Sequence, residues 1–200
     1  MKWLLCIVAL LTSGFANAEV TVTDVISAAQ VVSIKMGVSV STIVLHREPS
    51  PLGVAWRPME QACHIYISAP NVKYLDNLIG NQPMVPMLEG FLAHEIAHCV
   101  ELRAKVATSG VASLALYNSN MDVRVKAETM ADIVAIMYWK QEYPAQAARL
   151  IDTMISWRKS NHGTDTQHAT YPTLEKALPL IPARVSVSKA MSIRATIEDR

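Results

Sequence analysis

The sequence predicts an α+β fold in which a small strand-bearing part precedes a mainly helical part. Segments rich in Val, Ile and Thr lie in the first third of the chain, whereas the apolar pattern is helical from about residue 83 onward. The length of 200 residues favours a single domain. A hydrophobic content of 51% with 18% charged residues excludes an intrinsically disordered chain.

Residues 1–18 have the pattern of a secretory signal peptide. Lys2 gives a positive start, an apolar run follows at 3–11, and Ala16-Asn17-Ala18 is a small-residue cleavage site. The apolar run is shorter than the roughly 20 residues that span a bilayer. We therefore expect one mature domain at 19–182 without stable membrane insertion after cleavage, and an uncleaved anchor is the alternative.

The N-terminal part of the mature chain is expected to contain the strands. A helix capped by Thr23-Asp24 runs to Met36, and Gly37 stops it. The segments that follow are a strand at 38–46, a loop at 48–53, a short strand at 54–57, a strand at 62–68 and a short helix from Asn71 to Gly80.

The rest of the chain is expected to be helical. Helices are predicted at 84–105, 122–142, 144–159 and 172–180. The first of these is apolar on most sides and is therefore expected to be buried. Residues 161–170 form a polar loop, and residues 183–200 are expected to be a C-terminal tail or a terminal strand.

Charge and cysteine content narrow the class of protein. The 18 Lys+Arg residues barely exceed the 17 Asp+Glu residues, so no basic excess is present to neutralise phosphates, and we expect no nucleic-acid partner. Cys63 and Cys99 remain after removal of the first 18 residues. In an oxidising exported compartment such a pair favours a disulfide, and two separate buried thiols are the alternative.

The strongest candidates for metal-binding and catalytic residues lie in one segment, His94-Glu95-Ile96-Ala97-His98. Two histidines four residues apart lie one turn apart on a helix face and can bind one zinc ion. Glu95 can then reach the zinc-bound water as general base. The motif lies in the helix expected to be buried, where histidines need partners, and a metal supplies them. Two structural histidines and a surface glutamate are the alternative.

A catalytic zinc site needs a third protein ligand. Glu128 is the best candidate, since it follows on the next predicted long helix. Asp132 comes one turn later on the same face, where it can accept a hydrogen bond from a ligating histidine and fix its tautomer. The alternative is that Glu128 is an ordinary solvated glutamate and that Asp132 simply lies on a helix face.

His94-Glu95-Ile96-Ala97-His98 followed by Glu128-Thr129-Met130-Ala131-Asp132 resembles the gluzincin pattern, HExxH with ExxxD. The Ala-Asp pair is most like that of HtpX-like endopeptidases, of which only soluble exported members are comparable. The resemblance covers about residues 84–140 and extends weakly to 168–176. It implies a zincin-like core, one Zn²⁺, a protein or peptide substrate, and a donor for the developing oxyanion. His168 is the first candidate for that donor, followed by His162 and Tyr171.

The strand at 62–68 is expected to lie at the sheet edge beside the metal helix, because zincins bind substrate there as an added strand. A bridge between Cys63 and Cys99 would tie that strand to the helix one residue past His98. His64 is expected to be a strand surface residue rather than a ligand.

These observations favour an exported zinc metallopeptidase, periplasmic or secreted, with Glu95 as general base. The first alternative is a catalytically inactive zincin-fold binding or assembly protein of the cell envelope. A disulfide-stabilised structural protein without metal and an amidase acting on cell-wall peptides are the others.

Overall fold

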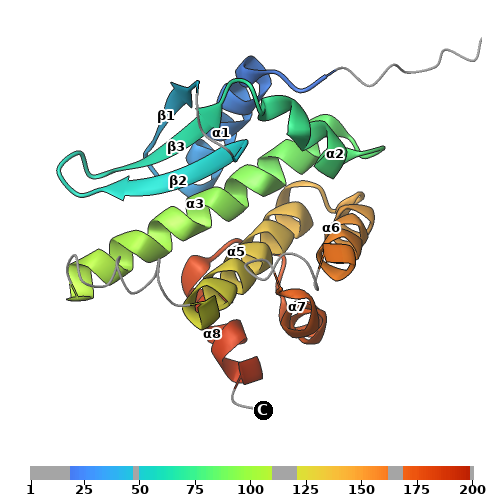
Figure 1. Ribbon diagram of the computed structural model, residues 1–200. Coiled ribbons are helices and arrows are strands. Elements are labelled where there is room, and N and C mark those ends of the chain that lie inside the picture. Colours follow the sequence, from blue (N-terminus) through green and yellow to red (C-terminus); the bar gives the residue numbers. More distant parts are fainter. Residues whose placement is uncertain (1–18, 47–49, 110–120, 162–168, 199–200) are drawn as a thin grey trace, which may run out of the picture.

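The computed structural model describes residues 19–46, 50–109, 121–161 and 169–198 (Figure 1). These ranges form an α+β fold that is mostly helical. The predicted signal peptide lies outside them. The elements are α1 (Val22–Met36), β1 (Val40–Leu45), β2 (Leu52–Arg57), β3 (Ala62–Ser68), a 3₁₀ turn (Val72–Tyr74), α2 (Leu75–Ile79), α3 (Met84–Ser109), α5 (Met121–Glu142), α6 (Ala147–Asn161), α7 (Tyr171–Ala177), a 3₁₀ turn (Leu178–Leu180) and α8 (Val187–Glu198).

The N-cap of helix α1 lies two residues before the predicted cap, Thr23-Asp24. Thr21 is the N-cap: its Oγ1 accepts a hydrogen bond from the Asp24 N–H, while the Asp24 carboxylate accepts one from the Thr21 N–H at 2.9 Å. This reciprocal pair is a capping box, which satisfies two backbone donors at once. Gly37 ends the helix as predicted, in the left-handed conformation (φ 64°) that glycine adopts without strain.

The sheet has the order β1-β3-β2, with β3 parallel to β1 and antiparallel to β2. The bounds predicted for the strand at 62–68 are confirmed, but the expectation that it lies at the edge is wrong. A short connection, residues 58–61, joins β2 to β3 as a hairpin, and β1 pairs with the other side of β3. The edge strand that lies along α3 is therefore β2 (Figure 1).

Helices α3 and α5 approach each other closely at the centre of the molecule. A Cβ atom built on Gly90 of α3 would lie 2.2 Å from the Trp139 indole of α5. The indole N–H donates a hydrogen bond to the Pro86 carbonyl at 2.7 Å, and the ring is fully buried. Position 90 therefore has room for glycine alone while Trp139 keeps this place.

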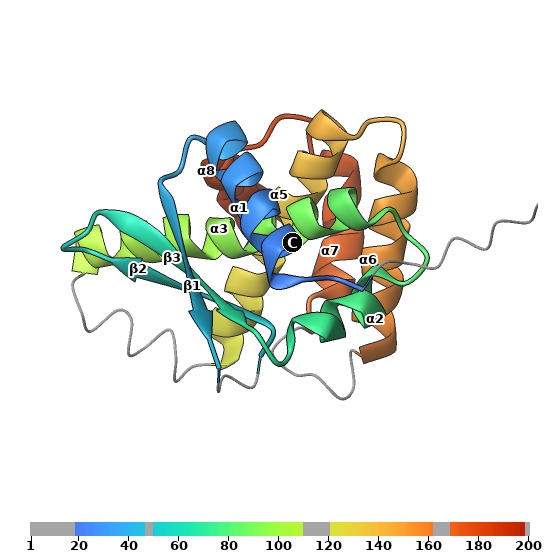
Figure 2. The ribbon, with the colours of Figure 1, turned by 90° about the horizontal axis from the view of Figure 1, so that it is seen from above.

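The C-terminal residues form helix α8 instead of the expected tail or terminal strand (Figure 2). Ala190, Ile193 and Ile197 recur at helical spacing and are buried, and α8 packs mainly against α5. The Val-Ser alternation at 185–188 is strand-like in sequence, but burial of this apolar row favours the helix.

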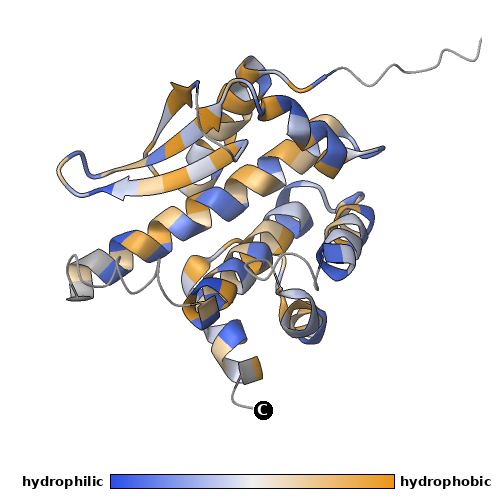
Figure 3. Cartoon of the chain, in the orientation of Figure 1, coloured by the Kyte–Doolittle hydropathy of each residue, from blue (hydrophilic) through white to orange (hydrophobic). Residues whose placement is uncertain are grey.

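The predicted cysteine pair is at disulfide distance. Cys63 of β3 and Cys99 of α3 are bridged with their Cα atoms 5.8 Å apart, and both are buried. The bridge joins the central strand to the helix turn that carries His98. Across the described ranges, the helices carry hydrophilic as well as hydrophobic residues (Figure 3), and none is both long enough and apolar enough to cross a membrane.

Candidate metal centre

His94, His98 and Glu128 converge between α3 and α5. The Nε2 atoms of the two histidines are 3.0 Å apart, and each lies 3.2 Å from one Glu128 carboxylate oxygen. Ligands at zinc–ligand distances of 2.0–2.1 Å in a tetrahedral site are roughly 3.3 Å from one another. The three side chains are thus close to the spacing of a shared ion, and the group could hold a metal.

The tautomer of His94 suits a metal ligand. Its Nδ1 lies 3.0 Å from Asp132 Oδ1, and because a carboxylate only accepts hydrogen bonds, Nδ1 carries the proton. In the neutral ring, Nε2 then presents its lone pair toward His98 and Glu128. This is the orientation that a carboxylate behind a ligating histidine imposes.

Asp132 is the buried anchor of the site. It is 0% exposed and accepts hydrogen bonds from four directions: His94 Nδ1 at 3.0 Å, Arg158 Nη2 at 2.6 Å, Arg158 Nε at 2.9 Å and Thr170 Oγ1 at 2.8 Å. A carboxylate offers about four lone-pair sites. Protein donors therefore fill all of its acceptor sites without water.

Arg158 and Thr170 are the residues that the sequence analysis missed. Arg158 also places Nη2 3.7 Å from a Glu128 oxygen, so it contacts both carboxylates of the centre. One signal was present, because Leu150, Met154 and Arg158 follow at four-residue spacing on α6 and all three are buried. A charged residue on an apolar row indicates a buried partner.

The charges of the site perturb its pKa values. Burial alone would lower the pKa of His94, but hydrogen bonds to Asp132 and Glu128 raise it to about 10. Burial would raise the pKa of Asp132, but the Arg158 charge and the bond to His94 lower it to about 2. In the same way, the charge of His98 and the hydrogen bonds of both histidines hold the pKa of Glu128 well below its usual value despite burial. The carboxylates are therefore ionised, and a proton on His94 must leave when a cation binds.

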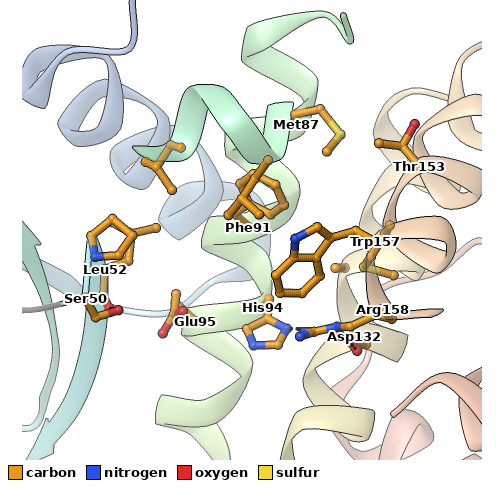
Figure 4. A pocket seen from close by; sticks show the side chains of 15 residues that line it. Ser50, Leu52, Met87, Phe91, His94, Glu95, Asp132, Thr153, Trp157 and Arg158 are labelled. Atoms are coloured by element: carbon orange, nitrogen blue, oxygen red, sulfur yellow. Dashed lines mark hydrogen bonds and ion pairs between the residues drawn. The ribbon is translucent and has the colours of Figure 1, made fainter. Parts of the chain in front are cut away.

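A cavity of about 250 Å³ opens beside His94 and Glu95 (Figure 4). Its walls come from α2, α3, α5, α6 and the start of β2. Glu95 is half-buried and lines the cavity together with its neighbour His94 and with Leu52 of β2. The carboxylate next to the first histidine thus faces the space that a substrate would enter.

Of the donors predicted for an oxyanion, only Tyr171 lies in the part of the chain that the structure describes, and it does not line the cavity. His168 and His162 lie outside the described residues. The Tyr171 hydroxyl donates to Glu175 at 3.1 Å, and Lys159 lies over its ring at 5.4 Å. The expectation of a surface position for His64 is wrong, because this residue is only 5% exposed and its Nε2 lies 2.7 Å from the Glu60 carboxylate.

Comparison with known proteins gives no match: no family model, no curated protein and no solved structure resembles the chain. Its own geometry therefore carries the functional argument.

Proposed function

We propose that the protein is an exported zinc-dependent metallopeptidase. The observation that carries the proposal is the convergence of His94, His98 and Glu128 with Glu95 beside them at a cavity. Two imidazoles and one carboxylate form the ligand set of catalytic zinc sites such as that of thermolysin. Magnesium and calcium prefer all-oxygen ligands, so the two nitrogens favour zinc.

The residues around the ion have separable roles in this mechanism. The chemistry that a bound zinc ion supplies is polarisation of the scissile carbonyl and acidification of water. Glu95 accepts the proton of the attacking water and passes it to the leaving nitrogen. Asp132 holds His94 in the tautomer that binds metal.

The charges of the site are compatible with a divalent ion. Glu128 and Asp132 are ionised, and Arg158 balances one of their two charges. Without metal, the proton on His94 balances the other, and a divalent cation would take over this role when that proton leaves.

Among the described residues no strand pairs with the outer edge of β2, and this edge supports a peptide substrate. The Ser68 N–H donates to the Pro51 carbonyl at 3.0 Å, so these two residues form a hydrogen-bonded pair. In an antiparallel ladder such pairs recur at every second residue, so every second residue after Pro51 bonds to β3. The backbone groups of Val54 and Trp56 consequently face away from β3. A peptide could add there as a further strand and pass Glu95, because the start of β2 also lines the cavity.

Export is proposed from two independent features. Disulfides persist in oxidising compartments, and Cys63 and Cys99 lie at disulfide distance. The sequence at 1–18 has the pattern of a signal peptide. Cleavage after Ala18 would be visible as a mature chain that begins at Glu19, in the periplasm or in the medium.

The test is the zinc content and peptidase activity of the protein expressed with its own first 18 residues. We expect one zinc per chain in wild type and in Glu142→Ala, a control on the same helix, and a strongly weakened site in Glu128→Ala. Glu95→Gln should keep zinc but lose peptide hydrolysis. Wild-type protein that binds no zinc refutes the proposal. Equal activity of wild type and Glu95→Gln removes Glu95 as base, and zinc without turnover in wild type favours the inactive binding protein.

A further inference from the structure

The cavity beside Glu95 has walls of large apolar side chains. Met87 and Phe91 come from α3, Met154 and Trp157 come from α6, and Ala135 of α5 contributes a small side chain. Figure 4 shows Met87, Phe91 and Trp157 grouped on one side of His94. Phe91 and Trp157 are only half-buried, so an occupant would cover apolar surface that is now exposed.

The size of the cavity suits one side chain of a substrate. Its volume is about 250 Å³. For comparison, an apolar cavity of about 150 Å³ in another protein stays dry and binds benzene. The space here therefore accommodates a phenylalanine, leucine or methionine side chain.

Apart from Glu95, which the proposed function assigns to the attacking water, the charged groups in the wall are committed to each other. Arg158 donates two hydrogen bonds to Asp132, at 2.6 Å and 2.9 Å, and both side chains are buried. A charged side chain that entered the cavity would lose its hydration without gaining an equivalent partner. An apolar side chain would instead gain from leaving water.

We infer that this cavity binds a large apolar side chain of the peptide substrate directly beside the cleaved bond, and that Ala135 and Trp157 determine which side chains fit. The inference rests on the proposed function and names its substrate class. The two methionines make the wall adaptable, because methionine fills irregular space with little strain. Ala135 sets the depth of the cavity, and Trp157 covers an apolar occupant.

The first test is cleavage of peptides that differ at one residue beside the cleaved bond. We expect kcat/KM for Leu, Met and Phe to exceed that for Ala, Asp and Lys by at least about tenfold, since a hydrophobic pocket discriminates by about that much for each methylene. Ala135→Leu should reverse the preference toward Ala. Ala147→Leu adds the same group at a buried alanine outside the cavity and should keep the wild-type profile.

The second test needs no activity. Toluene is titrated into protein with ¹³C-methyl-labelled methionines, and the Met87 and Met154 signals should shift to saturation. Met59, which is 98% exposed, is the internal control and should not shift. Ala135→Leu should abolish the shifts, and Trp157→Ala, at a half-buried position, should weaken toluene binding at least severalfold.

The outcomes separate the two proposals. Unshifted Met87 and Met154 signals overturn the pocket inference, even in a protein that binds zinc and cleaves peptides. A peptide profile that is flat, or that Ala135→Leu leaves unchanged, overturns it as well. Saturable shifts in a protein without zinc or turnover support an apolar pocket while the peptidase proposal fails.

Discussion

Replacing Arg158 with leucine would test how far the centre depends on side chains behind the metal ligands. The change leaves Asp132 buried without the guanidinium that now donates bonds of 2.6 Å and 2.9 Å. Removal of one partner of a buried ion pair costs about 3–5 kcal/mol. We expect a loss near the lower figure, about 3 kcal/mol, because Asp132 keeps its hydrogen bonds to His94 and Thr170.

A loss of this size would remove a large share of the roughly 5–15 kcal/mol that stabilises a typical domain. Zinc affinity should fall too, because Asp132 orients His94 and its own position depends on Arg158. Loss of a residue that hydrogen-bonds to a metal ligand typically weakens metal binding about 10–100-fold. Arg158 reaches His94 only through Asp132, and its contact with the Glu128 carboxylate is long at 3.7 Å, so we expect the lower figure, about tenfold.

The assay is urea unfolding of the metal-free protein at neutral pH, combined with a competition titration for zinc. Arg149→Leu is the matched control, since Arg149 lies on the same helix and its guanidinium makes an exposed hydrogen bond to the Asn81 carbonyl. This control should lose less than about 1 kcal/mol. An Arg158→Leu protein as stable as the control, with wild-type zinc affinity, would refute the account of Asp132 as the anchor.

Three further predictions concern helix packing, alkaline stability and the metal. Gly90→Ala places a Cβ 2.2 Å from the Trp139 ring. Crowding should cost about 1–3 kcal/mol, which outweighs the gain of about 1 kcal/mol in helix propensity, so urea unfolding should show a net loss of stability. Burial, reinforced by a hydrogen bond to Glu89, raises the pKa of Tyr138 above its usual value of 10.0. The stability from this raised pKa is complete below about pH 10 and is lost at higher pH, so urea midpoints should fall less steeply with pH in Tyr138→Phe. Zinc at 100 times the wild-type Kd should add about 2.7 kcal/mol to the free energy of unfolding of wild type. The same zinc concentration should not add this much to Glu128→Ala.

Each of these predictions has a result that would contradict it. Unchanged stability of Gly90→Ala would mean that α5 moves aside at little cost. Identical alkaline slopes in wild type and Tyr138→Phe would assign the loss to other groups, such as Tyr143, whose pKa is also raised by burial. Equal stabilisation of Glu128→Ala by zinc would move the third ligand elsewhere.

Features set by local chemistry could be predicted from the sequence. The strand Ala62–Ser68 was predicted to the residue, because alternation of apolar and polar side chains is a local pattern. The spacing of His94, His98, Glu128 and Asp132 placed them on the faces of two helices that the structure brings together. A four-residue spacing fixes a helix face whatever the tertiary context.

Features set by long-range packing could not be predicted in the same way. The central position of β3 depends on which strands flank it, and its own residues do not encode its neighbours. The partner of Arg158 lies 26 residues earlier on another helix, so only the burial of its row could have pointed to it. Helix α8 replaces an expected tail because Ile193 and Ile197 gain burial in the folded molecule, which outweighs their local preference for strand.

The contact between Gly90 and Trp139 supplies a criterion for finding relatives of this chain. Gly90 lies four residues before His94, and Trp139 lies seven residues after Asp132. Any descendant that retains the indole at this helix crossing must also retain the glycine, since the two share one volume. A search for the paired pattern, glycine with the histidine motif and tryptophan with the acidic motif, would distinguish inherited copies of this centre from chance occurrences of HExxH.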